Sequence, residues 1–407
     1  MALAIGIMII AGFFGGRLAH RIKFPMITGY IIVGVLLGPS VFKIISSTTV
    51  DNLHVFTSIA LGIIAYSIGG RLHLKAIHKM ERSLLLIGIL QAVGAFIMSL
   101  VAIVLIAPLF LNIPEATIIN TYLPMGLVIG AIASATAPAA ILALVREYRA
   151  RGPLTTTLLT LVAFDDAIAI ILFSIAIRVA PSISVGIGDF SSYQILLLPF
   201  LKVLGAIVMG VAFGFAIVYF TKFVKERSLL LVVVLGTIIL CVGVAKLLDL
   251  SEILSNMAIG FVVYNRLKIG TREKTFNVID DIEDVIFAMF FVLAGLHFDL
   301  GVIKIAGMLA LLITLGRFFG KYLGARTGAI IARSPQPVKT YLGLTLMPAA
   351  GVTIGLGLLA EGVFPTYGTI IYNSILASVI INELIAPSLV KYVIFKAGEQ
   401  RVDSITK

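Results

Sequence analysis

Thirteen apolar segments, of which the ninth is short, constrain the fold of this 407-residue chain more than any other feature. About 20 apolar residues cross the hydrocarbon core of a bilayer as a helix, which satisfies its own backbone hydrogen bonds. Mean hydropathy is +1.12 and 13% of residues are charged, against about 25% in soluble domains. We therefore predict an all-α polytopic membrane protein. Its approximate spans are 1–16, 25–43, 53–70, 84–110, 122–145, 153–178, 195–221, 228–248, 251–265, 280–297, 301–325, 338–360 and 366–395.

The positive charges predict the orientation of these spans. Most of the 31 Lys and Arg residues fall in the loops that follow odd-numbered spans or near the C-terminus. Basic loops face the cytoplasm, so we expect an external N-terminus and a cytoplasmic C-terminus, in a prokaryotic cytoplasmic membrane. The net charge of +11 then indicates contact with membrane lipid and no nucleic-acid partner. We expect a single transporter unit over 1–397 and a short cytoplasmic tail over 398–407.

The fifth and twelfth spans are interrupted at their centres, at 134–138 and 347–351, and each interruption contains a proline. Proline removes a backbone donor and frees carbonyl groups, which can ligate a cation. The interruptions lie seven spans apart, so the two halves would be inverted repeats. Matching breaks in two halves indicate a transport site near the bilayer midplane. Two unrelated proline kinks are the alternative.

Two adjacent carboxylates, Asp165 and Asp166, lie in the sixth span. An aspartate at the bilayer centre costs roughly 2.5–3.5 kcal/mol on insertion scales, so such residues normally face a protein interior or an ion path. Neighbouring side chains diverge by about 100° on a helix, which predicts separate roles. Proton and cation can compete for one of these carboxylates. Neutralisation of buried basic residues is the alternative.

Arg317 and Lys321 share one face of the eleventh span. Arg317 is nearer the middle of the span, whereas Lys321 can extend its ammonium toward the membrane surface. We therefore predict Arg317 as the partner of one aspartate. Arginine keeps its proton, so this partner implies one proton per cation and electroneutral exchange. A lysine partner would leave electrogenic exchange open.

Thr136, in the break of the fifth span, offers a hydroxyl and a carbonyl oxygen to a monovalent cation, and Ser134 is a weaker candidate. Packing between helices is the alternative role for both, because small hydroxyl residues are common at membrane helix contacts. The five histidines show no metal-ligand spacing. No cofactor is expected beyond the transported ions, and the lack of a Walker motif argues against ATP.

Further carboxylates lie at the tenth and thirteenth spans. Glu283 and Asp284 belong to an acidic cluster that we expect at the start of the tenth helix, where the helix dipole favours negative charge. The alternative is a funnel that concentrates cations and senses pH. Glu383 is a candidate for pH sensing or for packing.

Several short motifs occur in a shared order along almost the whole chain, at 24–40, 135–138, 164–166, 290–295 and 316–317. In these motifs the chain resembles the monovalent cation:proton antiporter-2 family. The resemblance implies a sodium/proton antiporter fold and a thirteen-helix homodimer with two broken crossing helices. It also implies a dimerisation subdomain and a core subdomain, the latter including about 84–178 and 301–395, that moves like an elevator.

By this resemblance Asp166 binds proton and metal cation in turn, and Asp165 pairs with the basic residue of the eleventh span. Two features depart from the family. The stretch 347–353 lacks the charged pair that many relatives carry there. Arg317 stands where electrogenic relatives carry lysine.

We therefore expect a transporter and not an enzyme: a secondary antiporter that exchanges Na⁺ or Li⁺ for protons by alternating access. Potassium:proton exchange is the nearest alternative. A cation channel or an organic-anion symporter of similar fold is a further one. A channel needs neither inverted breaks nor paired carboxylates, and an anion site would not be built from two aspartates.

Overall fold

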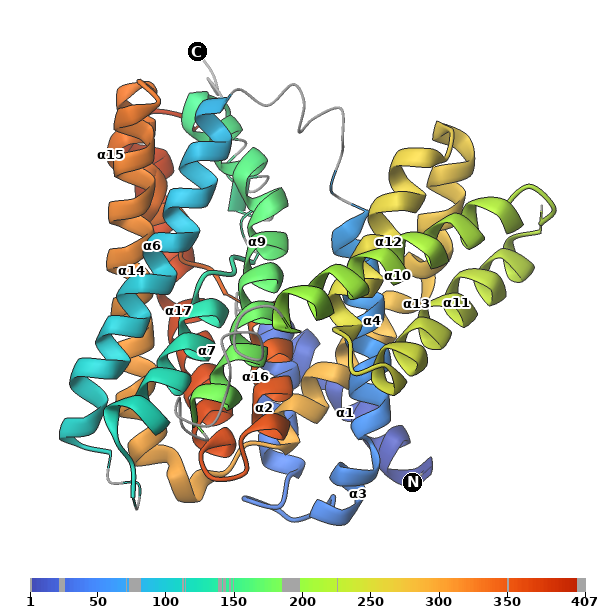
Figure 1. The fold of residues 1–407 in the computed structure, drawn as a ribbon, viewed down its shortest axis with the longest axis horizontal. Helices are drawn as coiled ribbons and strands as arrows, with labels where there is room; N and C mark the ends of the chain where they lie inside the picture. Colours follow the sequence, from blue (N-terminus) through green and yellow to red (C-terminus); the bar gives the residue numbers. More distant parts are fainter. Residues whose placement is uncertain are drawn as a thin grey trace. The chain divides into compact units, whose positions relative to one another are not determined.

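Long helices make up the computed structural model (Figure 1). It describes residues 2–21, 26–70, 72, 82–111, 113, 115–137, 141, 144–145, 148, 150–184, 198–224, 226–349 and 351–400. All regular secondary structure in these described stretches is helical. Seven of the described helices are long and apolar enough to cross a membrane, and shorter apolar helices accompany them. The prediction of an all-α polytopic membrane protein is confirmed.

The chain divides into two compact units, each built from two stretches of sequence. Unit 1 comprises Met1–Ile77 and Ile170–Ile303, and unit 2 comprises His78–Ala169 and Lys304–Lys407. Helix α9 passes from unit 2 into unit 1 within its length. The predicted division into dimerisation and core subdomains concerns assembly and motion, and it stays a prediction.

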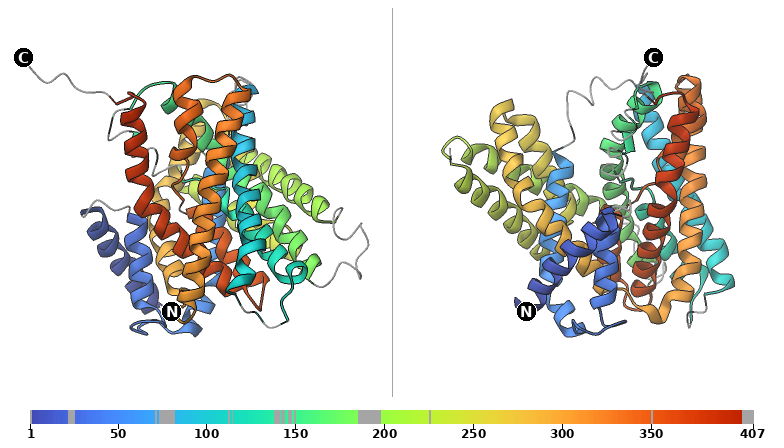
Figure 2. Two further views of the ribbon diagram at one scale, coloured as in Figure 1. Left: turned by 90° about the vertical axis from the view of Figure 1, so that its left-hand side faces the viewer. Right: turned by 180° about the vertical axis from the view of Figure 1, so that it is seen from behind.

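Unit 1 contains one helical bundle around α4, α12 and α13. Its helices are α1 (Ala2–Arg21), α2 (Met26–Leu37), α3 (Ser47–Asn52), α4 (His54–Gly69), α10 (Leu198–Phe220), α11 (Arg227–Leu247), α12 (Glu252–Arg266) and α13 (Ile269–Leu296), with the short η4 (Leu300–Val302). Helix α12 packs on α4 and α10, and α13 packs on α1 and α2. Both views of Figure 2 show α10 and α11 side by side.

Unit 2 carries both interrupted spans. Its helices are α6 (Arg82–Ile106), η1 (Ala107–Leu109), the π-helical turn η2 (Ile118–Tyr122), α7 (Leu123–Ala133), the first half of α9 (Pro153–Ser184), α14 (Ile303–Ile331), α15 (Gln336–Thr345), α16 (Gly351–Val363) and α17 (Gly368–Lys396). An apolar core joins side chains of α6, α9, α14, α15 and α17, including Ile87, Leu158, Ala325 and Val390.

Glycines bring α14 against α6 at backbone distance. Gly316, Gly320 and Gly324 recur at intervals of four along α14, so they share one face. A Cβ atom on Gly324 would collide with the backbone of Leu90, and one on Gly320 with the backbone of Gly94. Small residues at this spacing are typical of close helix contacts in membranes. The two helices run together in Figure 1.

The two predicted breaks are confirmed. Helix α7 ends at Ala133, and after the second break α16 begins at Gly351, six residues beyond the end of α15 at Thr345. Pro138 and Ala350 lie outside the described residues. The backbone N–H of Ala137 donates to the carbonyl of Pro348 at 2.9 Å. The two breaks therefore meet, which satisfies part of the backbone that each break leaves unpaired.

One predicted helix boundary is wrong. The tenth span was expected to begin at its acidic cluster, but α13 starts at Ile269, more than two turns earlier. The added turns are polar, and hydropathy alone excluded them from the span. Glu283 and Asp284 therefore lie inside the helix, beyond the first turn where the dipole favours negative charge.

Candidate ion-binding site

Asp165 is buried in unit 2, and both of its carboxylate oxygens accept hydrogen bonds. The Oδ1 atom accepts from Gln91 Nε2. The Oδ2 atom accepts from Thr136 Oγ1 and from Lys321 Nζ, the latter at 2.9 Å. A charge removed from water is stable only when it is paired and hydrogen-bonded. Helices α6, α9 and α14, together with the break after α7, supply these groups.

Lys321 is the basic partner of Asp165. Its ammonium also contacts Gln91 Oε1 at 2.8 Å, the Ser134 carbonyl at 2.7 Å and Thr136 Oγ1 at 2.7 Å. An ammonium has three donors, so four acceptors saturate it. The side chain is 0% exposed. The expectation that it extends toward the membrane surface is wrong, because the glycine face of α14 holds this turn directly against α6.

Arg317 has a different role from the predicted one. Its guanidinium donates to the carbonyls of Ala133, Leu346, Met347 and Pro348, with Nη2 to Pro348 at 3.0 Å. These are the carbonyls that the two breaks free from helical hydrogen bonds. For Asp165 the predicted pairing with Arg317 is corrected, because Lys321 makes that ion pair. Several carbonyls that were expected to ligate a cation are occupied by Arg317.

Asp166, the next residue on α9, is 4% exposed. Arg317 and Lys321 both attract it electrostatically. The partners of Asp165 are those named above, and the prediction that the two aspartates have separate roles stays a prediction. The assignment of Asp166 as the cation and proton carrier stays a prediction.

The hydroxyl residues of the first break differ from each other. Thr136 is part of the Asp165 cluster through its side chain. The Ser134 hydroxyl turns back to donate to Ala131 O at 2.6 Å, and only its carbonyl reaches Lys321. The Ser134 hydroxyl therefore binds within its own helix, and its predicted roles in cation binding or helix packing stay predictions.

Gln91 is a site residue that sequence reasoning missed. It is fully buried and bridges Asp165 and Lys321, with its amide also donating to Gly88 O at 3.0 Å. The available signal was a primary amide inside the apolar run of the fourth span. A buried amide requires partners on both its donor and acceptor sides, which points toward another polar site.

The hydrogen bonds and the ion pair described for Asp165 involve none of the remaining candidate carboxylates. Glu283 and Asp284 belong to unit 1. Glu383 lies on α17 and is buried, and its Oε1 atom has no hydrogen-bond partner among the described residues. A pH-sensing role for these three residues stays a prediction.

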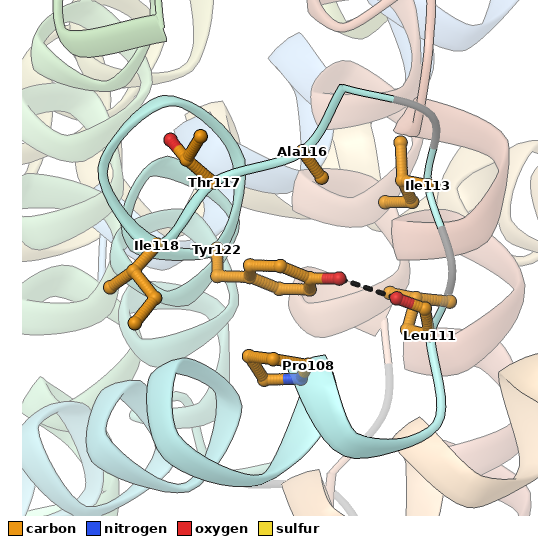
Figure 3. Close-up of a pocket in the computed structure, with 7 residues that line it drawn as sticks. All are labelled: Pro108, Leu111, Ile113, Ala116, Thr117, Ile118 and Tyr122. Atoms are coloured by element: carbon orange, nitrogen blue, oxygen red, sulfur yellow. Dashed lines mark hydrogen bonds between the residues drawn. The ribbon is translucent and has the colours of Figure 1, made fainter.

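A surface pocket of about 530 Å³ lies elsewhere in unit 2, where α6 leads through η1 and η2 toward α7 (Figure 3). Its seven lining residues are Pro108, Leu111, Ile113, Ala116, Thr117, Ile118 and Tyr122. The Tyr122 hydroxyl donates to the Leu111 carbonyl across it. The lining contains none of the residues around Asp165, so this pocket is not the candidate ion site.

The fold defines the class of the protein. Solved structures of the sodium proton antiporter MjNhaP1 from Methanocaldococcus jannaschii match with TM-scores of 0.77 and 0.76, at 19% and 18% sequence identity. The first match covers 97% of both chains and the second 99%. Unit 1 and unit 2 together therefore have a sodium/proton antiporter fold.

The family follows from the sequence match. Residues 5–396 match the transmembrane sodium/hydrogen exchanger family, and the chain belongs to this family. The Na⁺/H⁺ antiporter NhaS4 of Synechocystis sp. is 22% identical over 391 residues, covering 91% of this chain and 92% of the relative. The ammonium/H⁺ antiporter subunit AmhT of Alkalihalophilus pseudofirmus is 22% identical over 392 residues, covering 94% and 93%. The protein is an integral membrane protein of a transporter family.

Proposed function

We propose that this chain is a secondary antiporter that exchanges Na⁺ or Li⁺ for protons across the membrane, with Asp166 as the shared binding site. The observation that carries the proposal is the buried carboxylate pair beside the two meeting breaks. Asp165 is held by three donors and acts as a fixed counter-charge. Asp166, the next residue on α9, is the carboxylate that the resemblance to the antiporter family assigns to the transported ions. The protein binds and releases ions and transforms no substrate.

The exchange follows from the cost of an unpaired charge. A lone carboxylate deep in a membrane protein is unstable, whereas a carboxylate that holds a proton or a cation is neutral overall. Asp166 would cross between the two sides of the membrane only with one of these ions bound. Cation movement in one direction is thereby coupled to proton movement in the other.

The stoichiometry depends on Lys321. The expectation of electroneutral exchange rested on an arginine partner, which cannot release its proton. With a lysine as partner, exchange is electroneutral if Lys321 keeps its proton throughout the cycle. It is electrogenic if Lys321 releases that proton when the cation binds, because two protons then move for one cation.

The assignment to the antiporter-2 branch of the family is also part of this proposal. The motif order along the chain supports it. Within that branch we propose a homodimer in which unit 2 is the mobile core and moves like an elevator. The basic loops support a cytoplasmic C-terminus, in a prokaryotic cytoplasmic membrane.

A second candidate cation is ammonium. The Alkalihalophilus pseudofirmus relative is by name an ammonium/H⁺ antiporter subunit, and potassium remains the alternative from the sequence. These ions differ in size and hydration more than in charge. The oxygen groups around Asp166 would therefore set the selectivity.

The test uses purified protein in liposomes with an internal pH dye, challenged separately with Na⁺, Li⁺, K⁺ and NH₄⁺. Protein-free liposomes correct for the passage of ammonia through lipid. We expect a Na⁺- or Li⁺-driven pH change that Asp166→Asn abolishes. Asp249→Asn is the matched control, because it alters an exposed aspartate of unit 1. Full exchange by Asp166→Asn would overturn the assignment, and clamping the membrane potential separates the two stoichiometries.

A further inference from the structure

The residues that follow α17 fold back onto the start of α9. The Glu399 carboxylate accepts hydrogen bonds from the backbone N–H groups of Leu154 and Thr155, at 2.8 and 2.7 Å, and from the Thr155 hydroxyl at 2.7 Å. The side chain of Glu399 is buried although it lies beyond the last helix of the described chain. This glutamate was not a candidate in the sequence, because it lay in a segment read as a short tail.

The backbone fixes Glu399 in this position as well. Its N–H donates to Ile394 O at 3.1 Å, and its own carbonyl accepts from the Arg151 N–H at 2.8 Å. Gly398 just before it has φ +68°, a left-handed conformation that glycine adopts without strain. The chain therefore turns sharply at the end of α17. Glu399 binds the loop before α9 through its backbone carbonyl and the first turn of α9 through its side chain.

Glu399 supplies what the first turn of α9 lacks. The first four N–H groups of a helix have no partner inside it, and the helix dipole favours a negative charge there. Gly152 lies beside this contact, and a Cβ atom at that position would collide with the Glu399 carboxyl group. The local sequence thus leaves room for a carboxylate that comes from another part of the chain.

The position of α9 matters because it carries both aspartates. Asp165 lies ten residues after Thr155, or about 15 Å along the helix axis at 1.5 Å per residue. An intact helix transmits an axial shift at its first turn to the aspartates. Glu399 ties that first turn to the end of α17, and both ends belong to unit 2.

We propose that Glu399 is a positioning residue for ion exchange, which holds α9 so that Asp166 presents the correct geometry to the cation. This inference rests on the proposed function. Glu399 touches no transported ion and acts through α9 alone. Its loss therefore weakens cation binding more than it lowers the amount of folded protein.

The experiment compares Glu399→Ala and Gly152→Ala with wild type in the liposome assay, over a range of Na⁺ concentrations. Both variants remove the contact, one from each side. We expect the half-saturating Na⁺ concentration to rise about five-fold, the size of one lost helix cap, with the maximal rate changed less than about two-fold. Glu226→Ala is the matched control, since Glu226 stands at the start of α11 without a side-chain cap hydrogen bond.

Hydrogen exchange of the Leu154 and Thr155 amides gives a readout that does not depend on transport. We expect faster exchange in Glu399→Ala and no change in Glu226→Ala. Faster amide exchange with an unchanged half-saturating concentration would overturn the positioning role and leave a simple cap. Wild-type protein that exchanges none of the cations would instead overturn the proposed function, while the amide exchange still reports whether the contact exists.

Discussion

Two aspartates in this chain form ion pairs with basic side chains, and their surroundings are opposite. In unit 2, Asp165 pairs with Lys321 at 2.9 Å, and neither side chain is exposed. In unit 1, Asp249 pairs with Arg178 at 2.6 Å and also with Lys202, but its side chain is 67% exposed. By residue type alone, the two clusters have similar chemistry.

The difference between them is the solvent. Water and salt screen the Asp249 cluster, so such a pair contributes about 0–1 kcal/mol. Its role is local: it fastens the turn between α11 and α12, where Asp249 itself has φ +50°. The Asp165 cluster has no such screening, and removing one charge there leaves the other uncompensated, at about 3–5 kcal/mol. An ion pair of this kind therefore costs much more free energy to break when it is buried.

The largest expected effect is that of Asp165→Asn. It leaves the Lys321 ammonium buried without its counter-charge, so we expect a loss of about 3–5 kcal/mol in unfolding free energy and no ion exchange. Thermal unfolding in detergent and the liposome assay measure the two effects. An Asp165→Asn protein that unfolds at the same temperature as wild type would show that the buried pair stabilises the protein little more than the exposed one.

Gln91→Leu comes next. The substitution keeps the volume of the side chain but removes the donor to Asp165 and an acceptor of Lys321. Hydrogen bonds to charged groups contribute roughly 1.5–3 kcal/mol, and we expect a loss of that size in thermal unfolding. Gln91→Glu keeps the shape of the side chain and the acceptor for Lys321 but replaces the amide donor with a negative charge. It therefore separates the effect of side-chain shape from that of the lost donor. Unchanged stability in Gln91→Leu would mean that water replaces the amide and that the cluster is wetter than its burial indicates.

Gly324→Ala tests why Lys321 is buried at all. The added methyl group collides with the backbone of Leu90, so α6 and α14 must separate, at about 1–2 kcal/mol. Gly307→Ala is the control on the same helix, because a Cβ atom there meets nothing within 4 Å. We expect it to be neutral or slightly stabilising. Equal melting temperatures for both variants would contradict the glycine contact.

The smallest effect belongs to Asp249. Partial burial favours a higher pKa, but the hydrogen bonds and charges of Lys202 and Arg178 outweigh it and hold the pKa of Asp249 below its ordinary value of 3.8. Its stabilisation is therefore present at neutral pH and is lost only as the pH falls through this lowered pKa. We expect Asp249→Asn to cost at most about 1 kcal/mol at pH 7, and less at high salt. A large loss of unfolding free energy in Asp249→Asn at neutral pH would contradict the conclusion that the exposed ion pair stabilises the protein less than the buried one.

The sequence was informative where chemistry and spacing act along a single helix. The apolar runs predicted the helices, the prolines predicted the breaks, and a charge inside an apolar run marked Asp165. Thr136 followed from its place in a break. These features depend on local propensity and on the cost of burying charge, and neighbouring helices do not change them.

Only the tertiary structure decided between Arg317 and Lys321. Both lie on one face of α14, and the sequence places them along the helix axis without showing which helix that face meets. Close packing on α6 turned Lys321 to Asp165 and Gln91, and the meeting of the two breaks gave Arg317 its carbonyl partners. The same limit applies to Glu399, whose partner Thr155 is 244 residues away in the chain. Residue identity determined which groups must be paired, and packing determined the partners, because a contact between distant segments depends on geometry that no local pattern encodes.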